Sequence, residues 1–252
     1  MAGLKTVVRF LDETLDVASF PGDAALNGLQ VEGSRRVQAA AFAVDACRES
    51  IARAIRARAE LLVVHHGLLW GARAPLTGIL AARVGMLLRG GLSLYAAHLP
   101  LDCHPELGNN ARIAALIGLG DTEPFGLYAG ARIGLRGELP RPAGVRGLAA
   151  RLGRAFGAQV RAFPFGPARV RRLGIVSGGG ASLVQAAAEA GCDALLTGES
   201  SHASYHVARE NRINLFCAGH YATETAGVRA LADLLGERFG LRTVFIDLPT
   251  GL

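Results

Sequence analysis

The sequence predicts an α/β protein built from two similar, internally repeated halves. Three observations carry this prediction: strand and helix patterns alternate along the chain, continuous apolar runs mark strands covered on both faces, and the order of elements in the first half returns in the second. With 252 residues, of which 50% are hydrophobic and 19% charged, the chain can bury one large core or two smaller ones. This composition excludes intrinsic disorder as its main state.

The hydrophobic period and the turn residues define six elements in the first half. In chain order they are a strand at 39–44, a helix at 48–58, a strand at 61–64, a helix at 79–88, a strand at 92–97 and a helix at 109–117. The strand at 61–64 reads Leu-Leu-Val-Val, which is typical of a parallel strand buried on both faces.

The second half repeats this order. The strand residues 42–44 match 175–177 at an offset of 133 positions, and the same offset places 60–67 over 193–200 without a gap. The next strand, 92–98, matches 214–220 at an offset of 122. Both of these strands end in a histidine that is followed four residues later by an acid: His98 with Asp102, and His220 with Glu224. Chance similarity between β-α-β units is the simple alternative, but the paired endings favour a repeat.

We therefore expect two α/β halves, residues 1–125 and 126–252, packed together. The Arg-rich stretch 126–172 would link them and begin the second half. A single eight-stranded barrel fits less well, because the repeat is two-fold and the number of strands is low.

The charge is distributed unevenly. The chain carries +6, from 26 arginines, one lysine and 21 acids. Between Arg132 and Arg172, ten arginines oppose only Glu138, so this segment carries +9 and the remainder −3. It contains no helix-turn-helix, zinc-finger or RNP-like pattern, so nucleic acid is not an expected partner. We expect a solvated basic face, with a patch that attracts an anion, such as a phosphate-bearing substrate, as the alternative.

Hydropathy and cysteines indicate the environment of the protein. The mean hydropathy is +0.29, yet no apolar stretch reaches the ~18 residues that span a bilayer, and the N-terminus lacks the pattern of a signal peptide. The four cysteines show no Cys-x-x-Cys spacing, which predicts reduced thiols and neither disulfides nor a cysteine zinc site. We expect a cytoplasmic protein without a membrane partner, whose excess apolar surface lies in a core or a subunit interface.

Metal-capable side chains collect at the predicted strand ends. They are His65, His66, His98, Asp102, His220 and Glu224. Open parallel α/β sheets bind ligands beyond the carboxyl ends of their strands. Each histidine alone could be a hydrogen-bonded structural residue, and one of the adjacent pair at 65 and 66 could serve the fold. Together they favour a metal site, without thiolates, for zinc, manganese or iron, and ligands from two related halves make a dinuclear site plausible.

Two further polar segments follow strands of the second half. The turn Ser177-Gly178-Gly179-Gly180 could present backbone N–H groups to a phosphate, or could simply allow a helix to pack closely. The segment 197–202, which contains Glu199 and His202, has His206 one helical turn further on. It could support the metal site or supply a general acid and base, although helix caps explain its serines equally well.

The sequence resembles the NGG-interacting-factor-three-like family along nearly its whole length. The matching segments are Asn27-Gly28-Leu29-Gln30-Val31, Val63-Val64-His65-His66-Gly67, His98-Leu99-Pro100-Leu101-Asp102 running into Gly108-Asn109-Asn110, Ser177-Gly178-Gly179-Gly180, Thr197-Gly198-Glu199, and Gly219-His220-Tyr221 with Glu224. Several separated motifs in the same order make this resemblance specific.

The resemblance implies two intertwined α/β halves with mixed sheets and a dinuclear metal centre in the cleft between them. By motif position, the family's metal ligands correspond to His65, His66, Asp102, His220 and Glu224. His98 would either bind a metal or orient another ligand. The family also implies two divalent ions per chain and a toroidal homohexamer. The domain that longer relatives insert between the halves is not expected in a chain of this length.

Members of this family are often named type 2 GTP cyclohydrolase I. This name implies a small-molecule, nucleotide substrate: water activated by the metals would open the guanine imidazole ring and release formate. His202 or His206 would move protons, and Gly178, Gly179, Gly180 or Glu199 would contact the substrate. Two alternatives stay open. One is a dinuclear phosphohydrolase that acts on another substrate, and the other is a non-catalytic metal-binding assembly or interaction protein.

Overall fold

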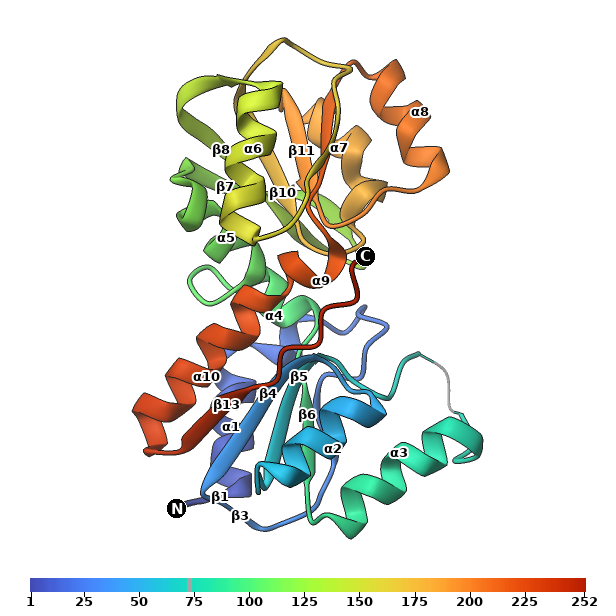
Figure 1. Ribbon diagram of the computed structural model, residues 1–252, viewed down its shortest axis with the longest axis vertical. Coiled ribbons are helices and arrows are strands. Elements are labelled where there is room, and N and C mark those ends of the chain that lie inside the picture. The colour runs from blue at the N-terminus through green and yellow to red at the C-terminus, as the bar shows by residue number, and fades with distance from the viewer. Residues whose placement is uncertain (72–73) are drawn as a thin grey trace. The chain divides into compact units, whose positions relative to one another are not determined.

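The computed structural model describes residues 1–71 and 74–252 and divides the chain into two compact units (Figure 1). Unit 1 comprises Met1–Leu101 and Gly227–Leu248, and unit 2 comprises Asp102–Ala226 and Pro249–Leu252. The chain therefore enters each unit twice. Within the described residues, no helix is both long and apolar enough to cross a membrane.

Unit 1 contains a five-stranded mixed sheet in the order β13-β4-β5-β6-β2. The strands β4 (Ala39–Asp45), β5 (Leu61–His66) and β6 (Ser93–Ala96) run parallel, β13 (Arg242–Phe245) lies parallel to β4, and β2 (Gly28–Val31) lies antiparallel to β6. A short antiparallel pair joins β1 (Ala2–Gly3) to β3 (Arg36–Val37). The helices are α1 (Leu4–Thr14), α2 (Arg48–Arg56), α3 (Gly78–Arg89) and most of α10 (Thr225–Phe239), with a 3-10 turn at Val17–Ser19.

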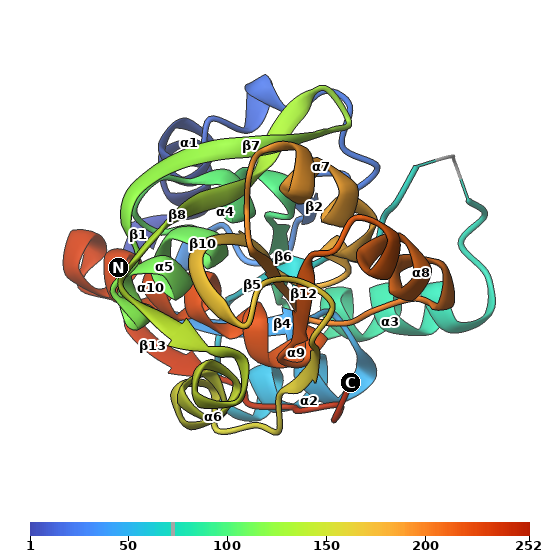
Figure 2. The same ribbon diagram turned by 90° about the horizontal axis from the view of Figure 1, so that it is seen from above.

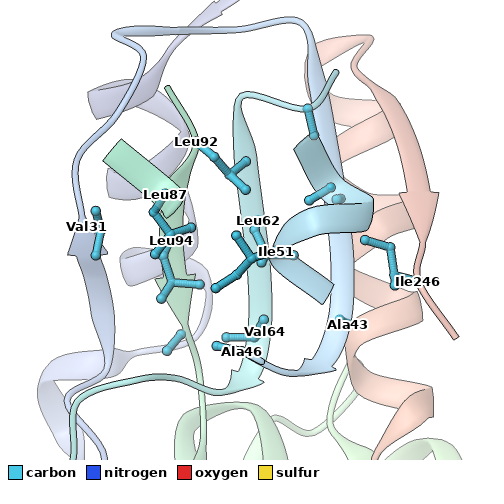
Figure 3. Close-up of a cluster of buried hydrophobic side chains, with 14 residues drawn as sticks. Val31, Ala43, Ala46, Ile51, Leu62, Val64, Leu87, Leu92, Leu94 and Ile246 are labelled. Carbon is cyan, nitrogen blue, oxygen red and sulfur yellow. The ribbon is translucent and has the colours of Figure 1, made fainter. Parts of the chain in front are cut away.

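One face of this sheet packs on α2 and α3. Leu62, Val64 and Leu94 of the strands lie in one buried cluster with Ile51 of α2 and Leu87 of α3, all essentially inaccessible to solvent (Figure 3). Burying each such side chain contributes about 1.5–3 kcal/mol. The cluster holds β5 in place, and β5 is the strand whose end carries two of the candidate ligands.

Unit 2 contains a six-stranded mixed sheet in the order β7-β8-β10-β11-β12-β9. The strands β10 (Arg169–Val176), β11 (Ala194–Thr197) and β12 (Asn214–Cys217) run parallel, while β7 (Gly120–Tyr128), β8 (Ala131–Gly144) and β9 (Arg161–Phe163) pair antiparallel with their neighbours. The helices are α5 (Asn109–Ile117), α6 (Val145–Phe156), α7 (Val184–Glu189), α8 (His202–Glu210) and the short α9 (His220–Thr223), with a 3-10 turn at Gly180–Leu183. Helix α4 (Leu99–Cys103) contains the boundary with unit 1.

Both faces of this second sheet are covered. Ile175 and Leu196 point into a cluster with residues of α5 and α6, whereas their chain neighbours Val176 and Leu195 point into another cluster with α7 and α8. Figure 2 shows α5 and α6 on one side of β10 and α7 and α8 on the other. The alternation follows from the two-residue period of a strand, and it explains why these strands are apolar without interruption.

The internal repeat is visible in strand pairing. Phe42 pairs with Val63 in unit 1 and Ile175 with Leu196 in unit 2, which preserves the offset of 133. The third strand departs from the expected offset of 122. The amide of Ala97 donates to the Val64 carbonyl (3.0 Å), and the equivalent bond runs from Ala218 to Thr197 (2.9 Å), an offset of 121.

His98 therefore corresponds in strand register to Gly219, and His220 lies one residue further along. The sequence comparison places His98 opposite His220, and the strand pairing places it opposite Gly219 instead. Gly219 has φ +98°, which side-chain-bearing residues rarely adopt. The turn at this glycine places His220 as the first residue of α9.

The six elements predicted in the first half are all present, with ends shifted by at most two residues. The expected division of the chain at 125/126 differs from the boundary between the two units, which lies between Leu101 and Asp102. The expected position falls inside β7, which pairs with β8 in the sheet of unit 2. Near the C-terminus, β13 returns to the first sheet beside β4, since an open parallel edge there accepts another strand.

The Arg-rich segment forms β8, α6, β9 and the start of β10. Five of its ten arginines contact carboxylates or carbonyl oxygens of unit 2: Arg136, Arg151, Arg169, Arg171 and Arg172. Glu138 alone bonds Arg171 (2.9 Å) and Arg172 (3.2 Å). These contacts give half of the basic residues a role in joining neighbouring strands and helices.

Truncation of a buried leucine in unit 2 should weaken the fold measurably. Leu152 of α6 is fully buried, so we expect Leu152→Ala to lower the free energy of unfolding by about 2–5 kcal/mol, as measured by denaturant titration. Leu116→Ala on α5 is the matched control, because that side chain is 57% exposed and its loss should cost less than about 0.5 kcal/mol. Equal effects of the two substitutions would contradict the described packing.

Candidate metal centre

The end of β5 delivers two adjacent histidines. His65 is fully buried and His66 is partly exposed, and their ring centroids lie 4.6 Å apart. The Nδ1 atom of His65 lies 2.8 Å from the carbonyl oxygen of Ala97, and Nδ1 of His66 lies 2.8 Å from Oδ1 of Asp45. A carbonyl oxygen only accepts, so Nδ1 of His65 carries the proton and its lone pair is on Nε2.

The end of β6 delivers His98, which a loop before β2 holds from two sides. Its Nδ1 lies 2.9 Å from Oδ1 of Asp23, and its backbone N–H donates to Oδ1 of Asn27 at 2.8 Å. The second carboxylate oxygen of Asp23 accepts from the amide of Leu99 (3.0 Å) and from Nδ2 of Asn27 (2.9 Å). Burial alone would raise the pKa of Asp23, but the hydrogen bonds from His98, Asn27 and the Ala25 amide outweigh it and lower the pKa to about 2.

These three residues, His65, His66 and His98, form a histidine trio. One ring nitrogen from each lies within 4.8 Å of the other two. Each ring places Nδ1 against a carbonyl or carboxylate oxygen, which is the arrangement that fixes a metal-binding histidine in the tautomer with its lone pair on Nε2. The trio therefore fits a divalent cation by both distance and donor chemistry.

A second donor group lies in unit 2, where α9 follows β12. Nε2 of His220 lies 3.2 Å from Oε1 of Glu224, and its Nδ1 lies 3.1 Å from Oε1 of Glu199. The hydrogen bond to Glu224 raises the pKa of His220 to about 9 against the opposing effect of burial, and Glu199 acts in the same direction as Glu224. The carboxylates of Glu199 and Glu224 on either side of the His220 ring favour a positive charge at this ring. A proton or a divalent cation can supply that charge.

Asp102 is the other carboxylate of unit 2, and it is nearly buried. Its Oδ1 accepts from Nδ2 of Asn109 (2.9 Å) and from Oγ of Ser177 (2.8 Å). The amide of Ser177 in turn donates to Oδ1 of Asn110 (2.9 Å). The Gly108-Asn109-Asn110 segment thus orients Asp102 and ties it to the end of β10.

The glycine turn after β10 packs directly on the second donor group. Gly178 has φ +59°, and a Cβ at this position would collide with Oε1 of Glu224. Its amide donates to Oγ1 of Thr223 (3.0 Å), and its carbonyl accepts from Oγ1 of Thr197 (3.0 Å) and from the amide of Gly198 (2.9 Å). In this structure the Gly178 amide is engaged by protein, and the turn allows the backbone to approach the carboxylate and the imidazole.

The other expected site residues occupy three different environments. Glu199 contacts Nδ1 of His220, so it orients a candidate ligand. Gly179 lies beside the same two side chains, whereas Gly180 packs against Val176. His202 and His206 are exposed on α8 with ring centroids 5.1 Å apart, and among the described residues neither joins a group of three or more metal-capable side chains.

Sequence reasoning missed two orienting carboxylates, Asp45 and Asp23. Asp45 ends β4, one residue beyond the strand expected at 39–44, so its place at the same sheet edge as His66 was a usable signal. Asp23 precedes its partner His98 by 75 residues in a loop with no periodic pattern. Asn27 and Gln30, part of the first motif, act alongside them: Asn27 holds His98, and Oε1 of Gln30 accepts from the amides of Leu68 (2.7 Å) and Leu69 (3.2 Å).

The order of these motifs matches a known family. Residues 2–250 match the Duf34/NIF3 (NGG1p interacting factor 3) family. The chain belongs to the Duf34/NIF3 family. This confirms the resemblance.

Relatives with similar sequences cover nearly the whole chain. A Pyrococcus abyssi protein is 46% identical over 247 residues, which is 98% of each chain, and an Archaeoglobus fulgidus protein is 47% identical over 249 residues, which is 99% of each. Both are named GTP cyclohydrolase 1 type 2 homolog. The crystal structure of a Thermus thermophilus protein superposes with a TM-score of 0.92 at 42% identity, covering 100% of both chains.

Removing the charge behind His98 should weaken metal binding. We expect Asp23→Asn to raise the dissociation constant for Zn²⁺ or Co²⁺ by about 10- to 100-fold, because the carboxylate orients the ring and increases its basicity. Competition with a chromogenic chelator measures this constant. The control is Asp16→Asn, at an exposed residue with φ 48°, a conformation that asparagine tolerates. Identical constants for the two variants would contradict the orienting role.

Adding one methyl group at Gly178 should disturb the second donor group. We expect Gly178→Ala to lose at least about 1 kcal/mol of stability and part of the bound metal, because the new Cβ meets Glu224 and φ is positive. Gly147→Ala in α6 is the control: apart from the backbone of its own helix and its chain neighbours, no heavy atom lies within 4 Å of an added Cβ, so stability should stay equal or rise by up to about 1 kcal/mol. Elemental analysis and denaturant unfolding compare the two variants, and unchanged metal content in Gly178→Ala would contradict the role of this close approach.

Proposed function

We propose that this protein is a dinuclear metal-dependent hydrolase. Its ligands are His65, His66, Asp102, His220 and Glu224, and His98 is a sixth. The observation that carries the proposal is shared by all four histidines: each places Nδ1 against an oxygen acceptor, at 2.8 to 3.1 Å, which leaves Nε2 as the nitrogen for a metal. In His220 this nitrogen lies 3.2 Å from Oε1 of Glu224, so a cation bound there would displace a proton. Imidazole and carboxylate donors suit zinc, iron or manganese, and we propose two divalent ions per chain.

The ions, when bound, would supply Lewis acidity and lower the pKa of water. The chain's own residues keep the donors in position. Asp45 and Asp23 orient His66 and His98, Ser177 and Asn109 orient Asp102, and Glu199 holds the Nδ1 proton of His220. Because these partners orient the donors, the proposal requires little rearrangement of the donors to accept a cation.

We propose GTP as the first substrate to test. The support is the shared name of the relatives and a donor set suited to hydrolysis. In this reaction the imidazole ring of guanine opens and formate leaves. His202 and His206 on α8 are exposed and would exchange protons with solvent, and Gly178, Gly179, Gly180 and Glu199 would line the substrate side of the His220 group.

A phosphohydrolase acting on another substrate would use the same donors. A non-catalytic metal-binding assembly is the second candidate, and one observation favours it: His65 is fully buried, as expected for an ion that stabilises a fold. Asp102→Asn separates the two classes. Loss of turnover with the fold and oligomer intact favours an enzyme, whereas loss of the oligomer with no turnover in any variant favours a structural ion.

We also propose a cytoplasmic homohexamer. The four cysteines are free thiols, which suits a reducing compartment. Several large apolar side chains are exposed near and on α3, namely Leu76, Ile79 and Leu88, and a subunit interface would cover such residues. The mass of the assembly, measured by light scattering, tests the oligomer.

Elemental analysis and GTP turnover on the same samples test the function. We expect about two ions per chain in protein purified without added metal, and formate release from GTP. Both should be lost in the His65→Ala/His220→Ala double variant. His104→Ala is the matched control, because that ring accepts the amides of Glu106 (3.1 Å) and Leu107 (3.0 Å) in a turn. Metal without turnover of GTP would remove the cyclohydrolase assignment, and protein without metal would overturn the whole proposal.

A further inference from the structure

The single tryptophan of the chain lies beside the histidine trio. Trp70 follows His66 by four residues, and its ring centroid lies 5.0 Å from that of His98 and 5.9 Å from that of His66. The rings of Trp70 and His98 meet at 71°, an edge arrangement. Yet Trp70 is 42% exposed, so much of its indole surface faces solvent.

Protein contacts hold the indole in place. Its Nε1 donates to the carbonyl of Gly67 at 2.9 Å. Its backbone pairs antiparallel with Ala25, and the amide of Leu26 donates to the Leu69 carbonyl at 3.0 Å. Gln30 accepts the amides of the two residues that precede Trp70. A ring fixed at its polar edge and on its backbone offers a rigid aromatic surface.

A fixed, half-exposed indole next to metal-capable side chains is suited to stack planar rings. A single exposed aromatic residue is ordinary, but its position beside polar, metal-capable side chains is typical of a ligand-binding surface. Aromatic side chains bind nucleobases by stacking, which every base permits because each has a π face. A cation-binding group nearby adds selectivity for rings that carry nitrogen or oxygen lone pairs.

We propose that Trp70 is the platform on which a planar heteroaromatic substrate stacks, so that the ring lies against the histidine trio. The inference rests on the proposed function, because it takes the trio as part of the metal centre. It adds what that function leaves open: the residue that recognises the ring, and the preference for an aromatic ring over the phosphate or sugar of a nucleotide. Trp70 is a positioning residue in this scheme.

Fluorescence and calorimetry test the proposal on the metal-loaded protein. Excitation at the red edge of indole absorption reports on Trp70 alone, since the chain has one tryptophan. We expect guanosine and GTP to quench its emission, and inorganic triphosphate and ribose 5-phosphate to leave it unchanged. By calorimetry, Trp70→Leu should weaken guanosine and GTP binding about ten-fold or more, and Trp70→Phe should restore most of it.

Controls separate stacking from metal loss and from surface effects. Elemental analysis should give the same metal content for the protein and both Trp70 variants. Triphosphate should bind Trp70→Leu as it binds the unchanged protein. Tyr128→Leu removes another exposed aromatic, on β7 in unit 2, and should leave the affinity for guanosine unchanged.

Four outcomes would overturn the proposal. The first is that Trp70→Leu binds guanosine as tightly as the unchanged protein, and the second is that Trp70→Leu loses triphosphate binding as much as guanosine binding. The third is that metal-loaded protein binds neither guanosine nor GTP. The fourth is that Trp70→Leu changes the mass of the assembly while its ligand affinity stays the same. The last would assign Trp70 to a contact between copies of the chain. Protein that binds no metal but still stacks guanosine on Trp70 would overturn the proposed function and keep the platform.

Discussion

One interaction supports the rest of the candidate site: the hydrogen bond from histidine Nδ1 to a fixed oxygen. It occurs at His65, His66, His98 and His220, with a carbonyl as acceptor in the first case and a carboxylate in the others. A histidine binds a metal through an unprotonated, correctly oriented nitrogen, and an acceptor at Nδ1 keeps a proton there and orients Nε2. In His220, Nε2 also lies 3.2 Å from Oε1 of Glu224, so a cation bound there would displace a proton. The loops, the glycine turn and the asparagine segment serve to place those acceptors and donors.

The two sheets supply the framework for this interaction. Parallel strands bring their carboxyl ends to one edge, and cores on both sides of unit 2 hold those strands rigidly. At such an edge the backbone must approach side chains closely, which explains the glycines. Gly178 leaves room for Glu224, and Gly198 allows contact with the backbone of His220, since a Cβ there would lie 2.6 Å from its Cα. Protein hydrogen bonds orient the resulting donors, a condition that favours tight binding.

Much of the framework was readable from hydrophobic pattern. Continuous apolar runs predicted β4, β5 and β6, and their pairing is parallel as expected. The antiparallel strands β7, β8 and β9 escaped this reasoning, because β7 and β8 contain prolines and glycines and β9 has only 3 residues, so none shows the continuous apolar run of a buried strand. The division of the chain also escaped it, since the return of β13 to β4 depends on an open sheet edge more than 190 residues away in sequence.

The sequence by itself determined the class of fold, the order of its main elements, the family and the histidines and acids that stand at strand ends. These are properties of local periodicity and motif spacing, which a chain carries whatever its neighbours are. Only the tertiary structure decided which oxygen stands behind each imidazole, as Asp23 does for His98 across 75 residues, and that His220 sits one residue beyond the register position of His98. A hydrogen bond of about 3 Å depends on the mutual placement of loops that no periodic pattern encodes.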